Sequence, residues 1–392
     1  MKISVLKFGG NSLKTIEIRN KVIDIIKSRL KSEIFPVVVV SAIGRDGDLY
    51  STDTLLNILP EASSERHKAL ISICGEIISA TLLAEELIKE GHPAIALTGW
   101  QAGILTNSSY IQAEVENINT TKIAEEIEKG IIPVICGFQG ISATGEITTL
   151  GRGGSDTTAA LIARALEAKQ LELFKDVEGL YTADPQIVKD AQVIKVLDYP
   201  EIAELLGNGA QIVHNPAIRQ LSDHQIPLLL GNTWTGEHGT CIQPCKKKRP
   251  VTGITSKSAL SLVTIETFSS AGIVEIFSAF SDLEISLDFI SVVQGRISFV
   301  VEDKNKYAVS LLDKFDVKSN IMSGFCKITV TGSGMTGQPG VMTKLIKSLE
   351  SGKINIEMAT DSYSTISCLI EESNEVKALN ILHTTFDLKE KS

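Results

Sequence analysis

The stretch GRGGSDTT, residues 151–158, is the most informative local signal of the fold class, because a predicted helix over residues 155–168 begins within it. Its three glycines let backbone amides form a nest for an anion, and Ser155 or Asp156 can cap the helix. The planar guanidinium of Arg152 fits a carboxylate in a bidentate manner. A glycine-rich loop before a helix is typical of α/β proteins, in which ligands bind at the carboxyl ends of parallel strands. A plain capped helix is the alternative, and the gathering of Arg, Ser and Asp favours a binding loop.

Strand and helix patterns alternate on both sides of this loop. Short apolar runs predict strands at residues 3–8, 37–40, 94–97, 132–136, 171–174 and 227–230. Helical periodicity predicts helices at residues 16–30, 65–90, 155–168 and 216–224. This order predicts an α/β fold with a mostly parallel sheet and helices on both faces.

A second glycine loop, KFGGNS at residues 7–12, directly follows the first predicted strand and precedes a helix. Gly9 and Gly10 let backbone amides approach an anion, and Lys7 supplies a positive charge for phosphate oxygens. No Gly-Lys-Ser/Thr follows, so the loop is not a Walker A motif. Glycine turns after strands are common, and this loop alone indicates a phosphate site only weakly.

Four further motifs lie where the predicted sheet presents its ligand edge. They are Ser41-Ala42 with Thr52-Asp53, Gly75-Glu76, GFQG at residues 137–140, and KDVEGLYTADP at residues 175–185. Each motif taken singly is more often structural than functional. Their common position after strands or along helices favours one shared site.

The pattern changes near residue 250, and two similar stretches of about sixty residues follow. Each reads as strand, glycine-started helix, two strands and a final helix, which predicts two α+β units of βαββαβ type. The predicted domains are a catalytic domain at 1–240, a linker at 241–249 and a regulatory region at 250–392. Within that region we expect units at about 259–322 and 323–392, with 250–258 adding a strand.

Length and charge limit the possible functions. At roughly 150 residues per domain, 392 residues predict two or three domains. The net charge of −9 repels phosphate backbones, so no nucleic-acid partner is expected. No apolar run approaches the roughly 18 residues of a membrane span, and the start lacks signal-peptide features, so we expect a cytoplasmic protein without a membrane partner. Cys241 and Cys245 lack a second ligand pair, and no metal-ligating residue set is expected.

These motifs, in this order, resemble those of the aspartokinases, and the likeness spans nearly the whole chain. KFGG and GRGGSD at this separation are its most specific elements. The resemblance implies an amino-acid-kinase fold followed by paired ACT domains, closest to the single-function type of diaminopimelate and lysine biosynthesis. It implies phosphorylation of the β-carboxylate of L-aspartate with ATP and Mg²⁺. The product, 4-phospho-L-aspartate, would lead to diaminopimelate, lysine, threonine and methionine under feedback control.

The resemblance also implies roles for individual residues. Lys7 would stabilise the transferring phosphate, and Asp156 would orient Lys7 and the metal-bound phosphates. Arg152 would bind the α-carboxylate of aspartate and Glu76 its ammonium group. The same amino-acid pocket would be lined by Ser41, Thr52, Phe138 and Ser155. The nucleotide and its phosphates would be held by Lys7, Gly9, Gly10, Asn11, Gly153, Gly154, Lys175, Asp176, Tyr181, Gln186 and Gln211.

Four of these positions differ from the usual residue of the family. Asn11 and Lys175 each replace a threonine, Gln186 replaces an arginine, and Gln211 replaces a lysine. Two alternatives therefore stay open. One is a related kinase acting on another acid, such as glutamate or acetylglutamate, and the other is a catalytically weak homologue that binds an amino acid as a regulator.

The second ACT-like unit contains a predicted effector site. A glycine turn opens its first helix, so free amides and the positive end of the helix dipole can hold a carboxylate. A facing strand ends near two polar residues that can receive an ammonium group. The predicted effector-binding residues are Gln338, Pro339, Gly340, Val341, Asn355, Ile356, Asp361 and Ser362. We expect lysine, meso-diaminopimelate or threonine to bind there, and we expect a homodimer or higher homo-oligomer through the ACT units.

Overall fold

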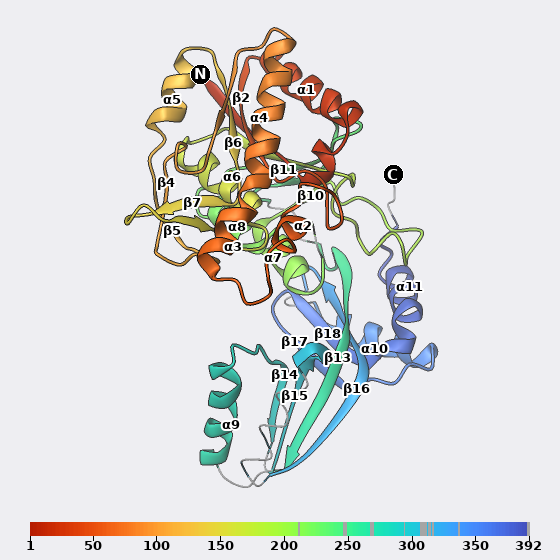
Figure 1. Ribbon diagram of the computed structural model, residues 1–392. Coiled ribbons are helices and arrows are strands. Elements are labelled where there is room, and N and C mark those ends of the chain that lie inside the picture. The colour runs from red at the N-terminus through yellow and green to blue at the C-terminus, as the bar shows by residue number, and fades with distance from the viewer. Residues whose placement is uncertain are drawn as a thin grey trace. The chain divides into compact units, whose positions relative to one another are not determined.

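A computed structural model places the chain in two compact units (Figure 1). The structure describes residues 1–210, 212–245, 249–266, 270–293, 295–305, 312, 315, 317–335 and 338–389. The first unit comprises Met1–Leu180, Val193–Leu206 and Gln211–Lys246, and the second comprises Tyr181–Gln192, Gly207–Ala210 and Lys247–Ser392. Among the described residues, no helix has the length and apolar character needed to cross a membrane.

An eight-stranded sheet forms the centre of the first unit, in the order β10-β12-β11-β9-β1-β2-β6-β3. Neighbouring strands are parallel except for β11 and β12, which confirms the prediction of a mostly parallel sheet. The strands are β1 (Lys2–Phe8), β2 (Ile34–Val40), β3 (Ala94–Leu97), β6 (Ile132–Cys136), β9 (Gln170–Lys175), β10 (Val196–Leu197), β11 (Leu228–Asn232) and β12 (His238–Ile242).

Helices cover both faces of this sheet, because its strands are apolar on both sides. Helices α1 (Ile16–Lys31) and α4 (Cys74–Lys89) pack with Leu6, Phe8 and Phe174 on one face. Helix α6 (Gly154–Ala165) packs on β1, β2 and β9. Around this sheet lie α2 (Thr52–Leu56), α3 (Glu65–Ser72), α5 (Thr121–Glu128), α7 (Tyr199–Gly207), α8 (Asn215–Ser222) and a small sheet of β4 (Ile104–Thr106), β5 (Val115–Ile118), β7 (Gln139–Ser142) and β8 (Ile147–Thr149).

The predicted single helix over residues 65–90 is wrong, because α3 and α4 are separate helices that meet at Ile73. The side-chain amide of Gln139 donates a hydrogen bond of 2.9 Å to the Ile73 carbonyl. The helical hydrogen bond from Ile77 N–H to the same carbonyl is long, at 3.3 Å. A side chain inserted into the backbone ladder is a recognised cause of helix breaks.

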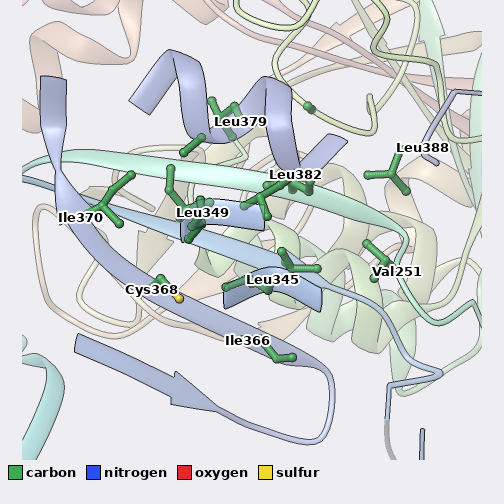
Figure 2. Close-up of a cluster of buried hydrophobic side chains, with 14 of the residues drawn as sticks. Val251, Leu345, Leu349, Ile366, Cys368, Ile370, Leu379, Leu382 and Leu388 are labelled. Atoms are coloured by element: carbon green, nitrogen blue, oxygen red, sulfur yellow. The ribbon is translucent and has the colours of Figure 1, made fainter. Parts of the chain in front are cut away.

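A six-stranded antiparallel sheet forms the second unit, in the order β14-β15-β13-β16-β18-β17. Its long strands β13 and β16 take part in both halves, with α9 over one half and α10 and α11 over the other (Figure 1). Figure 2 shows the buried side chains beneath α10 and α11, among them Leu345, Leu349 and Leu382. The elements are β13 (Gly253–Glu266), α9 (Ser270–Asp282), β14 (Asp288–Val293), β15 (Arg296–Glu302), β16 (Lys318–Thr331), α10 (Val341–Ser351), β17 (Met358–Asp361), β18 (Thr365–Glu371) and α11 (Glu375–Thr385).

Two details of this unit differ from expectation. The strand expected in residues 250–258 is not separate, because Gly253–Glu266 is one continuous strand. Asn355 and Ile356 precede β17, which begins at Met358, so they do not lie on the facing strand as predicted.

Candidate active site

The carboxyl ends of β1, β2, β6 and β9 meet the start of α6 around a cleft of about 890 Å³. This is the edge at which parallel sheets bind ligands. Twelve of the predicted site residues line the cleft: Lys7, Gly10, Ser41, Thr52, Glu76, Phe138, Arg152, Gly153, Gly154, Ser155, Asp156 and Lys175.

Lys7 and Asp156 form a buried ion pair on the floor of the cleft. The Lys7 Nζ atom lies 2.6 Å from Asp156 Oδ1, and each residue is only 5% exposed. Burial by itself works to raise the pKa of Asp156, but the ammonium groups of Lys7 and Lys175 outweigh it and lower that pKa to about 2. The Asp156 carboxyl is therefore ionised at neutral pH.

A second lysine, Lys175 at the end of β9, approaches the same carboxylate. Its Nζ atom lies 3.4 Å from Asp156 Oδ2. Burial lowers the pKa of Lys175, Asp156 opposes that effect, and the neighbouring charge of Lys7 adds to it.

Glu76 lies near the start of α4 and is 2% exposed. Its Oε1 atom accepts a hydrogen bond of 3.1 Å from the Ala42 N–H, while Oε2 has no hydrogen-bond partner among the described residues. Burial raises the pKa of Glu76 to about 8. A buried carboxyl with a free oxygen in a cleft is suited to a cationic group of a ligand.

Each of the two glycine loops has a glycine with no room for a side chain. A Cβ atom on Gly10 would lie 2.2 Å from the Gly44 carbonyl oxygen. Gly153 has a φ of 74°, and a Cβ atom there would lie 2.3 Å from Cγ of His214. Gly153 is also the residue that caps α6, so the first amides of this helix face the loop.

The remaining predicted nucleotide residues lie outside the cleft lining. The Asn11 side-chain amide donates a hydrogen bond of 2.8 Å to Asp176 Oδ2, which also pairs with Arg45 at 2.8 Å. Gly9, two residues before Asn11, directly follows the end of β1. Tyr181 and Gln186 belong to the second unit, where Tyr181 packs against its core. Gln211 lies outside the described residues.

Several cleft residues were missed by the sequence analysis. Arg45 and Asp46 lie in the loop after β2, where the strand-end rule used for Ser41 would have found them. Lys68 and Ser72 lie four residues apart on one face of α3, which is a separate helix from the one that carries Glu76, so the spacing to Glu76 gave no signal. Gln112 comes from a loop between β4 and β5, and no local pattern indicates its position.

The second unit has a pocket of about 600 Å³ at the start of α10. Gly340, with a φ of 101°, caps this helix. Predicted effector residues in the pocket lining are Gln338, Gly340, Val341, Asp361 and Ser362, whereas Pro339, Asn355 and Ile356 are outside it.

Comparisons with known proteins agree with this architecture. A model of the amino acid kinase family matches residues 2–232, and a model of the ACT domain matches residues 328–386. The structure is similar to that of E. coli aspartokinase III in complex with aspartate and ADP, with a TM-score of 0.82 at 22% identity over 98% of this chain and 99% of that chain. The same enzyme in complex with lysine and aspartate gives a TM-score of 0.78 at 22% identity, covering 100% of both chains.

Sequence relatives cover the full length of the chain. The aspartokinase of Geobacillus stearothermophilus is 34% identical over 100% of this chain and 99% of its own length. Aspartokinase 1 of Bacillus subtilis (strain 168) is 32% identical over 99% of this chain and 100% of its own length. The chain is therefore a member of the aspartokinase family, the kinases that phosphorylate aspartate.

Proposed function

We propose that the cleft of the first unit binds ATP and L-aspartate together and transfers the terminal phosphoryl group to the β-carboxylate, giving 4-phospho-L-aspartate. The observation that supports this most directly is the gathering of complementary charges in one cleft. The buried Lys7–Asp156 pair, the free oxygen of Glu76 and the guanidinium of Arg152 all lie there.

The amino-acid end of the site is assigned by charge. The Glu76 carboxyl, desolvated and half unpartnered, would bind the α-ammonium group of aspartate. Arg152, exposed in its loop, would bind the α-carboxylate bidentately. The rest of the amino-acid pocket would be formed by Ser41, Thr52, Phe138 and Ser155.

The phosphate end lies at Lys7. Its ammonium would stabilise the negative charge of the transferring group, and Asp156 holds that ammonium in place. The backbone of Gly10, Gly153 and Gly154 and the start of α6 would cradle the phosphates. Gly9, Asn11 and Asp176 lie next to this end of the cleft and would support the nucleotide.

Mg²⁺ would arrive with the nucleotide. In the described part of the chain, no three His, Cys, Asp or Glu side chains gather into a metal site, and both oxygens of Asp156 face lysines. This donor set fits a magnesium ion held mainly by the phosphates themselves, as is usual for kinases. When bound, the ion neutralises charge on the phosphate oxygens.

The pocket at α10 supports feedback control by an amino acid, with lysine, meso-diaminopimelate or threonine as candidates. The amides at Gly340 can hold a carboxylate, and Asp361 can pair with an ammonium group. The lysine complex of E. coli aspartokinase III adds support for lysine among these candidates.

A homo-oligomer through the second unit is also proposed. The edge strand β14 exposes Ile290, Val292 and Val293, and β16 exposes Ile321 and Met322. An open edge with apolar side chains favours association with a second copy. Light scattering at working concentration tests this, and a monodisperse monomer would contradict it.

Free aspartate and ATP are cytoplasmic metabolites, so we infer that the enzyme works in the cytoplasm.

The substrate proposal is tested by trapping the acyl phosphate as a hydroxamate. The purified chain is incubated with ATP, Mg²⁺, hydroxylamine and one acid at a time: L-aspartate, L-glutamate or N-acetylglutamate. Product with aspartate, and far less with the other two acids, is the expected result. Product only with another acid would overturn the substrate, and no product with any acid would favour a catalytically weak homologue.

A further inference from the structure

Two lysines share one carboxylate in the catalytic cleft. Lys7 from β1 contacts Oδ1 of Asp156 at 2.6 Å, and Lys175 from β9 contacts Oδ2 at 3.4 Å. Strands β1 and β9 are parallel neighbours, with Lys7 opposite Leu173. Because side chains alternate along a strand, Lys175 projects to the same face as Leu173 and Lys7, which is the face that α6 covers.

The backbone of Lys175 is hydrogen-bonded, and its side chain is more exposed than that of Lys7. Its carbonyl oxygen accepts hydrogen bonds from Thr233 N–H at 2.9 Å and from Thr233 Oγ1 at 3.1 Å. The Lys175 side chain is 26% exposed, compared with 7% for Lys7. Its ion pair is also the longer of the two. An entering anion can therefore compete for Lys175 more readily than for Lys7.

The charge of this cluster is unbalanced. Two ammonium groups face one carboxylate, which leaves one excess positive charge on the floor of a partly buried cleft. Desolvated charge that is only partly neutralised is unfavourable, and a polyphosphate would supply further negative charge. Burial lowers the pKa of Lys175, in line with its longer and less complete ion pair.

We propose that Lys175 is a second phosphate-binding cation, which rests on Asp156 in the free enzyme and moves onto the terminal phosphates of the nucleotide when it binds. This inference rests on the proposed function, because it takes this cleft as the ATP site. Lys7 keeps its bond to Asp156 and faces the transferred group. The two lysines thus have different roles: Lys7 acts on the reaction, and Lys175 acts on nucleotide affinity.

A pH dependence follows from the surroundings of Lys175. The charged groups around it are Asp156 on α6, Lys7 on β1 and the adjacent Asp176. Bound phosphate stabilises the protonated amine, so nucleotide binding raises the pKa of Lys175. Affinity is full while the amine is protonated, and it falls as the pH rises through the lowered pKa of the free enzyme.

Titration calorimetry with a non-hydrolysable ATP analogue and Mg²⁺ tests the proposal on wild type, Lys175→Met, Lys175→Arg and the control Lys122→Met. Lys122 is a half-exposed lysine of α5 with its own partner, Glu126. The loss of one charged hydrogen bond predicts binding about 10- to 100-fold weaker in Lys175→Met. AMP, which lacks the terminal phosphates, should bind both proteins equally. Lys175→Arg should restore analogue binding and extend it to higher pH, and Lys122→Met should match wild type.

Three results would overturn the inference. They are wild-type affinity in a folded Lys175→Met, equal weakening of analogue and AMP, and an alkaline limit that stays unchanged in Lys175→Arg. A lower kcat with unchanged affinity would instead make Lys175 a positioning residue for Asp156. A wild-type chain that binds the analogue but forms no aspartyl hydroxamate would overturn the proposed function and leave this inference standing. Thermal unfolding shows whether Lys175→Met is folded, and Lys175→Gln replaces it if it is not.

Discussion

Each unit holds some side chains in an energetically unfavourable environment, and the kind of environment differs between the two units. The first unit buries ionisable side chains, because Lys7, Asp156 and Glu76 are all at most 5% exposed in its cleft. The second unit exposes apolar surface, with Val292 on β14 at 52% and Val293 at 57%. A parallel sheet covered on both faces leaves only its strand ends for a site, whereas an antiparallel sheet has edges open to a partner. The contrast fits the proposal of chemistry in the first unit and of association and regulation in the second.

Loss of the buried ammonium should have the largest effect. Lys7→Ala should lower kcat by about 100- to 1,000-fold, because it removes charge from the point where negative charge develops. Steady-state kinetics measure this, with Lys2→Ala, an exposed lysine of the same strand, as the control. Near-normal turnover in Lys7→Ala would contradict the assignment of the catalytic role to this cleft of the first unit.

Substitutions at the amino-acid end of the cleft should have a smaller effect than Lys7→Ala, and the effect should appear in the KM for aspartate. Glu76→Gln and Arg152→Ala should each raise the aspartate KM by about 10- to 100-fold, since each removes one charged partner. The MgATP KM should stay nearly constant. Equal damage to both KM values would show that the two substrates do not divide the cleft as assigned.

A substitution in the α10 pocket of the second unit should weaken inhibition by the effector and leave turnover without effector unchanged. Asp361→Ala should raise the inhibitory concentration of the effector several-fold, because coupling between such sites is typically about 1–3 kcal/mol. Inhibition curves with lysine, meso-diaminopimelate and threonine measure the shift. Full inhibition in the variant would place the effector outside the α10 pocket.

The smallest expected effect is the release of a proton from Glu76 when aspartate binds. Burial raises the pKa of Glu76 to about 8, so the free enzyme holds this carboxyl mostly protonated at pH 7. An ammonium ligand favours the ionised form, so aspartate binding should release close to one proton at pH 7, and affinity should rise toward pH 8. Calorimetry in buffers of different ionisation enthalpy measures this release. Glu76→Gln should release none, and proton uptake by wild type would reverse the assignment.

Much of the catalytic cleft could be predicted because strand-end positions are local in sequence. Lys7, Ser41 and Phe138 each follow or end a strand, and the sheet gathers them. The free oxygen of Glu76 could not be predicted, because it depends on what packs around α4. The shared use of Asp156 by Lys175 depends in turn on the pairing of β1 with β9.

The second unit was harder to predict for a physical reason. Strand β13 runs through a polar stretch at Lys257 and Ser258, which resembles a strand end. A bulge there, with Ala259 at a φ of 56°, keeps β13 paired with β16 on both sides of the irregularity. Pairing between strands about sixty residues apart overrides the local pattern, and one long strand replaces the two that were expected.

The membership of Tyr181–Gln192 in the second unit limits how the gene can be divided. This segment gives Ala183, Val188 and Ala191 to the core shown in Figure 2, and Thr182 Oγ1 lies 3.0 Å from Nε2 of His383 on α11. A fragment ending at residue 245 would carry these apolar side chains without their packing partners and expose them to water. A single cut in the linker therefore does not separate two self-sufficient proteins. Recombination between family members that preserves both cores must exchange this internal segment together with the C-terminal region.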